Sequence, residues 1–202
     1  MIIRPAHIVD CVNIASIQVE NYQRAYAGLL PADYLRRFSV AEQTRDWKDW
    51  FKQREVIREK REGLTQDRIS TNQGEILLVS ENEATEICGY ALGRLGISNF
   101  PPYRSELVAL HVRQPCQGQG IGRGLVVEMA YRLKADGCSS MMCWVLEGNP
   151  ARQFYERLGG KEIGKQTITL DEYSTQAVEI AYGWKDISKL TNENIINSVD
   201  EG

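Results

Sequence analysis

The chain has 202 residues, of which 43% are hydrophobic and 25% are charged. These fractions are those of an ordinary globular domain, so they exclude a largely disordered or coiled-coil protein. The formal net charge is −3, which argues against non-specific binding to nucleic acid, because such binding needs a basic face.

The sequence also argues against a membrane protein and a metal protein. No stretch reaches the roughly 20 consecutive apolar residues of a membrane helix, and the N-terminus lacks the pattern of a secretory signal. The five cysteines form no C-x-x-C pair, and His7 and His111 are the two histidines, so no metal site is expected. We therefore expect a cytoplasmic chain with reduced, mostly packed thiols.

The N-terminal part predicts a short strand followed by helices. The strand at 2–5 ends at a proline, and Asp10 is expected to cap a helix that fades near residue 26. Pro31 begins a second helix, and Ser39 caps a third that carries Trp47, Trp50 and Phe51. The polar stretch 52–74 is predicted to be a mobile insertion.

From residue 75 onward the pattern changes to short strands. Strands are expected at 75–80, 87–95, 106–112, 141–146, 161–170 and 176–184, with one helix after the glycines at 118–124 and another from Asn149-Pro150 to 158. This order predicts an α/β (α+β) fold with a mixed, largely antiparallel central sheet flanked by helices. We expect one domain over 1–184 and a polar tail over 185–202.

A glycine-rich turn lies between the strand at 106–112 and the following helix. Its residues are Gln117, Gly118, Gln119, Gly120, Ile121, Gly122, Arg123 and Gly124. Glycines allow tight bends, and the helix start supplies unsatisfied N–H groups, so the turn is a candidate anion site. The dinucleotide pattern G-x-G-x-x-G and the pattern G-x-x-x-x-G-K-[ST] both fail here, whereas Q-x-x-G-x-G fits, at Gln117, Gly120 and Gly122.

On these residues the sequence resembles the GNAT superfamily of N-acetyltransferases. The strand before the turn and the segment 145–159, with its Asn149 and its F-Y-x-x-x-G ending, support the resemblance, as do Arg4, Asp10 and the segment 26–31. It covers about 1–184 in element order, and its specific motifs occupy roughly 106–159. Two departures are Gln114, where the family often has proline, and His111, where it often has tyrosine.

The resemblance implies acetyl-CoA as cosubstrate and no metal. The implied cofactor-binding residues are Leu110, His111, Val112, Gln117, Gly118, Gln119, Gly120, Ile121, Gly122, Arg123, Asn149, Arg152 and Tyr155. Backbone N–H groups at 110–112 would polarise the thioester carbonyl if the strand bulges or splays there. Asn149 would bind the pantetheine arm, although it is equally suited to cap the helix after it.

Acetyl transfer to an amine needs a base for the amine and benefits from an acid for the leaving thiolate. By resemblance, Tyr155 is the acid or orients the thiol; the alternative is that it is a helix-packing aromatic. Glu106 is the candidate base, directly or through water, because strand alternation places it on the face of Leu110; the alternative is a solvated edge charge. His111 is expected on the opposite face and to be hydrogen-bonded or partly buried. Cys116 is expected to be incidental.

The expected function is transfer of an acetyl group from acetyl-CoA to a primary amine of a small molecule or peptide, by direct attack in a ternary complex. Tyr22 and Tyr26 are candidate acceptor-binding residues, although aromatics at helical spacing are more often core. One alternative is a non-catalytic acyl-CoA-binding regulatory module on the same fold, and a weaker one is a nucleotide-binding α/β protein. A homodimer through the C-terminal hairpin, as in some relatives, remains open.

Overall fold

The elements of the protein follow the order that the sequence predicts. The computed structural model describes residues 1–62, 74–96, 100–170 and 175–191. In chain order the elements are β1 (Ile2–Pro5), η1 (Ile8–Asp10), α1 (Cys11–Ala25), α2 (Ala32–Arg36), α3 (Val40–Glu62), β2 (Glu75–Glu81), β3 (Ile87–Leu95), β4 (Ser105–Val112), η3 (Gln114–Cys116), α4 (Ile121–Ala135), β5 (Met141–Leu146), α5 (Ala151–Arg157), β6 (Lys161–Leu170), β7 (Thr175–Trp184) and α6 (Ser188–Thr191). Of the insertion expected over 52–74, residues 52–62 instead continue α3 and residues 63–73 lie outside the described part of the chain, as does the tail from residue 192.

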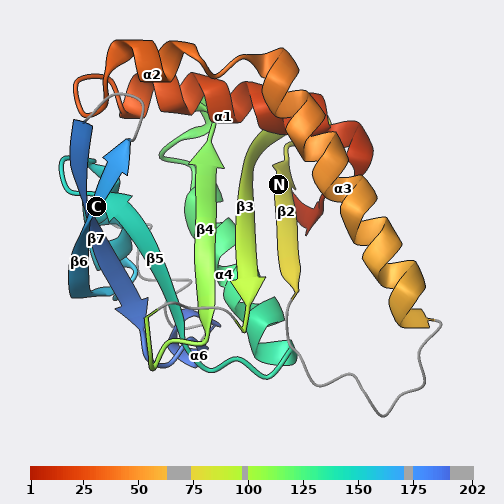
Figure 1. Cartoon of the computed structure of the whole chain (residues 1–202). Coiled ribbons are helices and arrows are strands. Elements are labelled where there is room, and N and C mark those ends of the chain that lie inside the picture. The colour runs from red at the N-terminus through yellow and green to blue at the C-terminus, as the bar shows by residue number, and fades with distance from the viewer. Residues whose placement is uncertain (63–73, 97–99, 171–174, 192–202) are drawn as a thin grey trace.

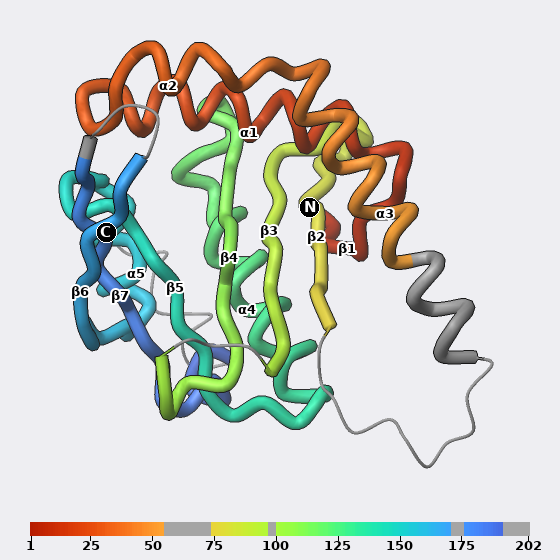
Figure 2. Tube along the Cα trace, viewed as in Figure 1, coloured from red at the N-terminus to blue at the C-terminus, as the bar shows by residue number. Residues whose placement is uncertain are grey.

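A seven-stranded sheet forms the centre, with strand order β1-β2-β3-β4-β5-β7-β6 (Figure 1). The pair β4 and β5 is parallel, and the other neighbouring pairs are antiparallel. The expected mixed, largely antiparallel sheet is therefore confirmed. The trace in Figure 2 shows that β1, the first strand of the chain, lies at one edge beside β2.

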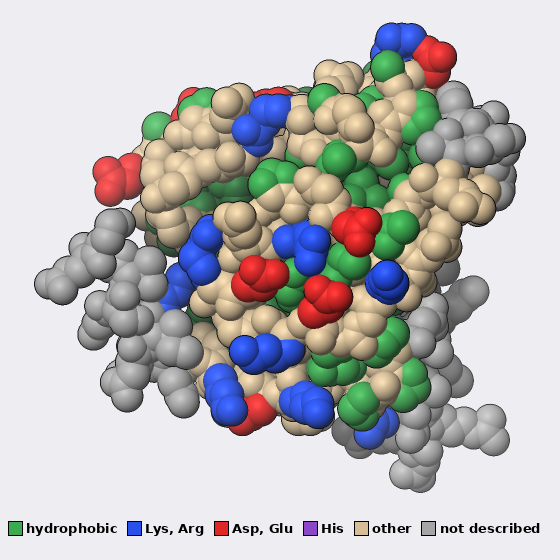
Figure 3. Space-filling model, turned by 90° about the vertical axis from the view of Figure 1, so that its left-hand side faces the viewer, with side chains coloured by type: hydrophobic (Ala, Val, Ile, Leu, Met, Phe, Trp, Pro, Cys, Tyr) green, Lys and Arg blue, Asp and Glu red, His purple; other side chains and the backbone are tan. Residues whose placement is uncertain are grey.

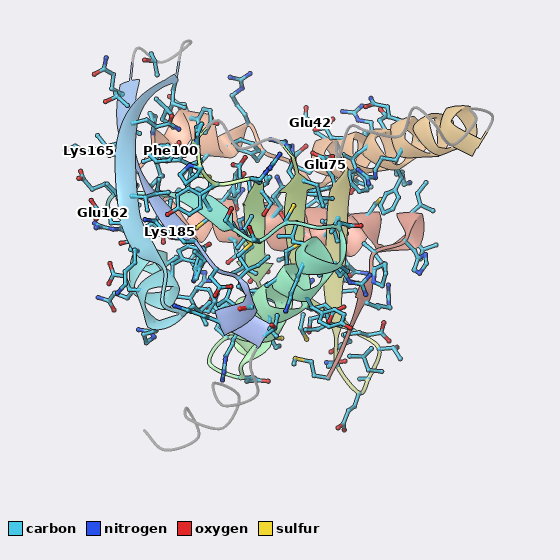
Figure 4. The ribbon with its side chains drawn as sticks, turned by 90° about the horizontal axis from the view of Figure 1, so that it is seen from below. Glu42, Glu75, Phe100, Glu162, Lys165 and Lys185 are labelled. Carbon is cyan, nitrogen blue, oxygen red and sulfur yellow. The ribbon has the colours of Figure 1, made fainter. Side chains whose placement is uncertain are left out.

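Helices cover both faces of the sheet. Viewed from below, α1 to α3 lie on one side and α4 on the other (Figure 4). The apolar face of α4 fully buries Leu125, Met129 and Leu133 against the sheet, and α1 buries Ile14 and Ile17 on the opposite side. Spacings of three and four residues put each set on one helix face, so burial of these faces drives the layered packing.

The residues that begin two of the helices act differently from each other. Ser39 Oγ accepts the N–H of Glu42 at 3.2 Å, as expected of a capping residue. Asp10 makes no side-chain cap on α1. Its carboxylate instead accepts the N–H of His7 at 2.8 Å and pairs with Arg4 at 2.8 Å, because an ion pair of low exposure outcompetes a neutral cap.

The packed body continues past residue 184, where we expected the domain to end. Ile187 is fully buried and Leu190 is 3% exposed, and both belong to the core under α4. Farther out, at the β6 edge of the sheet, lysines, arginines and acidic side chains are interspersed over the surface (Figure 3). Within the described part of the chain, no helix combines the length and the apolar character needed to cross a bilayer.

Candidate active site

The glycine turn is held in a defined shape. Gly118 and Gly120 both have a φ of +76°, a left-handed conformation that glycine adopts without the steric penalty of a side chain. The Gln117 side chain donates to the carbonyl oxygen of Val112 at 2.9 Å, and Gln119 donates to that of Pro115 at 3.0 Å. The turn is therefore fastened to the end of β4 and to η3.

The main-chain N–H groups of the turn are available to a ligand. Within the described residues, those of 118–122 donate to no protein acceptor, and α4 begins at Ile121 with Gly120 as a cap that offers no side-chain bond. A helix N-terminus also carries partial positive charge. A Cβ on Gly122 would meet Phe154 at 3.4 Å, so the start of α4 lies against the Phe154 ring of α5. These features suit a diphosphate.

Beside the turn, β4 and β5 diverge. They pair at Glu106 and Met142 and separate toward their C-terminal ends (Figure 1). Arg113 donates its N–H to Cys88 on β3 at 2.8 Å. Because N–H groups alternate along a strand, those of Leu110 and Val112 point the other way, toward β5. The splay on which the role of 110–112 depends is therefore present, and it leaves donors on the side where the strands part.

A β-bulge in β4 changes which residues share a face. Ala109 lies opposite Leu92 and Leu107 lies opposite Gly93, so Val108 is the extra residue. Leu107 and Leu110 accordingly both pack toward α4, whereas Ala109 packs toward α1.

The bulge corrects the expected position of Glu106. Since it alternates with Leu107, Glu106 shares the α1 face with His111, so the expectations that it shares the face of Leu110 and lies opposite His111 are wrong. Regular alternation fails here because the sequence does not reveal the inserted residue. Glu106 therefore lies on the same side of the sheet as α1, which carries Tyr22 and is followed directly by Tyr26.

Glu106 has the environment of a tuned carboxylate. Burial raises its pKa, and the nearby guanidinium of Arg94 opposes this effect. The Arg94 Nη1 to Glu106 Oε2 distance is 3.7 Å, and Arg94 also reaches Glu75 at 3.2 Å. The repulsion of Glu179 adds to the rise. A carboxylate with a raised pKa is a better proton acceptor than an exposed glutamate.

Tyr155 is buried in α5, with 7% of its surface exposed. Its ring lies 5.3 Å from that of Phe154 and 6.1 Å from that of Trp184, so the packing role is real. Its hydroxyl makes no hydrogen bond within the described residues. Burial raises the pKa of Tyr155 well above its ordinary value, so the phenol is protonated at neutral pH and is a weaker acid than an exposed tyrosine.

The remaining predicted cofactor residues already have partners. Asn149 is buried, and its Oδ1 accepts the N–H of Ala151 at 2.9 Å. This bond is the helix-capping role that the sequence offers as the alternative for Asn149. Arg152 donates to the hydroxyl of Tyr182 at 3.1 Å and pairs with Glu162 at 3.3 Å. Its contacts therefore lead to the outer strands, so a phosphate would have to compete for this guanidinium. Arg123 lies in the first turn of α4.

The predicted acceptor residues lie in an aromatic cluster. The ring of Tyr22 is 5.1 Å from that of Tyr26, 4.9 Å from Phe38 and 5.6 Å from His111. Burial lowers the pKa of His111 to about 4 and raises that of Tyr26. His111 is neutral at pH 7, and it is partly buried, one of the two environments expected for it, with no side-chain hydrogen bond within the described residues.

Three neighbours of the cluster were not identified as site residues from the sequence. Phe38 contacts Tyr22 from the end of the second helix, and Leu29 lies against Gly148. Glu179 on β7 acts electrostatically on Glu106, Tyr22 and Tyr26. No local signal marks these residues, because they reach the site only through tertiary folding.

Comparisons with known proteins agree with this geometry. Residues 87–169 match the family described as FR47-like protein. The chain is 26% identical over 188 residues to the uncharacterized N-acetyltransferase YuaI of Bacillus subtilis, an alignment that covers 93% of this chain and 95% of that protein.

Solved acetyltransferases share the fold. The PaiA N-acetyltransferase of Thermoplasma acidophilum, in complex with coenzyme A, superposes with a TM-score of 0.63 at 18% identity, over 91% of this chain and 98% of that one. The yncA protein of Salmonella typhimurium, with its cofactor acetyl-CoA, superposes with a TM-score of 0.63 at 19% identity, over 91% of this chain and 92% of that one. These matches show that the chain has the fold of the solved acetyltransferases and is similar in sequence to an N-acetyltransferase over most of its length.

Proposed function

We propose that this protein transfers the acetyl group of acetyl-CoA to a primary amine of a small molecule or peptide, by direct attack within a ternary complex. The observation that carries the proposal is the placement of the turn 118–122, with its N–H groups open to a ligand, beside the point where β4 and β5 part. That arrangement suits a diphosphate followed by an extended arm. The names of YuaI and of the solved relatives support the same activity.

In the proposed complex, the N–H groups of 118–122 and the start of α4 bind the diphosphate. The arm lies where the strands diverge, and the N–H groups of Leu110 and Val112 donate to the thioester oxygen, which gains negative charge during attack. Asn149 keeps its cap on α5, and its remaining amide donors face the arm.

The proton transfers are assigned to Glu106 and Tyr155. An amine with a pKa of about 10.4 is mostly protonated at neutral pH, so a base must remove a proton before attack. Glu106, directly or through a water molecule, takes this role from the α1 face, where Tyr22 and Tyr26 hold the acceptor. Tyr155 then donates its proton to the departing thiolate. Because burial raises the pKa of Tyr155, the phenol keeps this proton until that step.

Two measurements test the proposal. Titration with acetyl-CoA should show binding by the folded protein, and release of free CoA thiol should appear with at least one member of a broad panel of amines. Glu106→Gln and Tyr155→Phe should each lower kcat by roughly 10²-fold while acetyl-CoA binding remains.

Matched controls separate chemistry from folding. Tyr131→Phe changes an exposed tyrosine of α4, and Glu83→Gln changes an exposed carboxylate in the β2–β3 turn; both should keep the wild-type rate. Unchanged thiol release in Glu106→Gln and Tyr155→Phe would remove both assignments. Binding of acetyl-CoA without release to any amine would instead indicate the non-catalytic acyl-CoA-binding module.

A further inference from the structure

Two cysteines meet beside the glycine turn, on the side of β2 and β3. Cys88 is 4% exposed at the start of β3, and Cys116 is half-buried at the end of η3. Both thiols are free, both line one pocket, and the neighbouring Cys116 side chain contributes to raising the pKa of Cys88. The contact was not expected, because 27 residues separate the two positions in the sequence.

Backbone structure holds the two cysteines near each other. Ser80 pairs with Gly89 and Glu81 pairs with Ile87, so Cys88 is the extra residue of a bulge, a device that redirects a side chain. The chain after β4 is tied to the same place, since Arg113 donates its N–H to Cys88 at 2.8 Å and Cys116 donates its own to Arg113 at 2.9 Å. The pair is thus held together by main-chain bonds at both ends.

An open pocket of about 530 Å³ gives access to the pair. Both cysteines line it together with Met1, Ser80, Gln119 and Ile121. The Ser80 hydroxyl is fully buried at its wall and has no hydrogen-bond partner within the described residues. A buried polar group without a partner costs free energy, and a polar ligand in the pocket would supply the missing bond.

We propose that Cys88 and Cys116 form a dithiol modification site that reacts with a low-molecular-weight disulfide entering this pocket. The more exposed Cys116 attacks as its thiolate, forming a mixed disulfide and releasing one thiolate of the reagent. Cys88, once deprotonated, attacks the Cys116 sulfur, forming the Cys88–Cys116 disulfide and releasing the second. The two protons of the protein thiols pass to the two released thiolates, so the protein is oxidised by two electrons and the reagent is reduced by two.

The bond has a consequence for the cofactor, which rests on the function proposed above. Disulfide formation brings the sulfurs to about 2.05 Å from each other. Cys116 directly precedes Gln117, whose side chain fastens the turn to β4. Drawing Cys116 toward β3 therefore moves the start of the turn, and the oxidised protein should bind acetyl-CoA at least threefold more weakly than the reduced protein.

The first test uses glutathione disulfide on the full chain. Burial raises the pKa of Cys88 to about 11, so the second step should become faster as the pH is raised from 7 toward 9. Mass spectrometry of the product should show the loss of two hydrogen atoms and a cross-linked peptide pair containing Cys88 and Cys116. Cys116→Ser should abolish the cross-link, whereas Cys138→Ser, a buried cysteine outside the pocket, should retain it.

Each possible result bears on the site, on its coupling to the turn or on the proposed function. Absence of the Cys88–Cys116 peptide pair, or its formation in Cys116→Ser, would overturn the site. A cross-link with unchanged acetyl-CoA affinity would overturn its coupling to the turn. If oxidation forms the cross-link but the reduced protein does not bind acetyl-CoA, the proposed function is refuted and the dithiol site stands.

Discussion

Leu29 lies so close to Gly148 that a Cβ on the glycine would stand 2.5 Å from the Leu29 Cδ2 atom. The segment between α1 and α2 thereby touches the segment between β5 and α5. The first segment follows Tyr26, a proposed acceptor residue, and the second leads into Asn149. The contact therefore links the proposed acceptor side of the site to the proposed cofactor side.

This contact predicts the effect of Gly148→Ala. The added methyl group should push Leu29 aside, cost about 1–2 kcal/mol of stability as overpacking does, and raise the KM for the amine more than that for acetyl-CoA. The measurement is steady-state kinetics alongside thermal unfolding.

A second substitution provides the control. Leu29→Ala in the Gly148→Ala background removes the clashing atoms, so it should recover part of the loss. Additive effects of the two substitutions would contradict a direct contact between these residues.

Gly120→Ala should weaken acetyl-CoA binding. The residue has a φ of +76° with open space around the Cβ position, so the cost is backbone strain of about 1–2 kcal/mol, and relief of that strain would turn N–H groups away from the diphosphate. Gly137→Ala is a matched control, because it has a φ of +81°, the same open space and a position at the far end of α4. It should lose similar stability but keep its acetyl-CoA affinity, and equal affinity losses in both variants would point to general destabilisation.

The pH dependence of the rate should report Glu106. Activity requires the ionised carboxylate, so kcat/KM should fall as the pH falls through its pKa, which burial raises above the ordinary value of a glutamate. Arg94→Gln removes the cation that opposes this rise, so it should move the acid limb of the profile to higher pH. The limb should vanish in Glu106→Gln. An acid limb that stays in place in all variants would assign it to another group.

The stability of the protein should depend on His111 at acid pH. Folded, its pKa is about 4, whereas in the unfolded chain it is about 6.5. Between these values the unfolded state binds more protons, so the free energy of unfolding should drop by about 3 kcal/mol as the pH falls from 6.5 to 4.

Replacement of His111 isolates this contribution. His111→Phe should flatten that part of the curve in denaturant titrations, relative to the wild type. The other histidine, His7, is exposed, and His7→Phe should keep the wild-type slope. A steep slope that persists in His111→Phe would assign the loss to carboxylates instead.

The sequence by itself determined the order of the elements, the mixed sheet and the turn at Gln117, Gly120 and Gly122. Apolar periodicity and turn residues act locally along the chain, so they can be recognised without knowing the fold. Its place in a strand made Glu106 a candidate base, and the resemblance to the GNAT superfamily made Tyr155 a candidate acid.

The tertiary structure decided how those residues face one another. The bulge at Val108 moved Glu106 to the α1 face, and folding brought Cys88, at a second bulge, into one pocket with Cys116, which was expected to be incidental. Likewise, Leu29 and Glu179 reach the site from distant segments. A bulge depends on pairing with a neighbouring strand, and long-range contacts depend on the packing of whole layers, so neither leaves a local mark in the order of the amino acids.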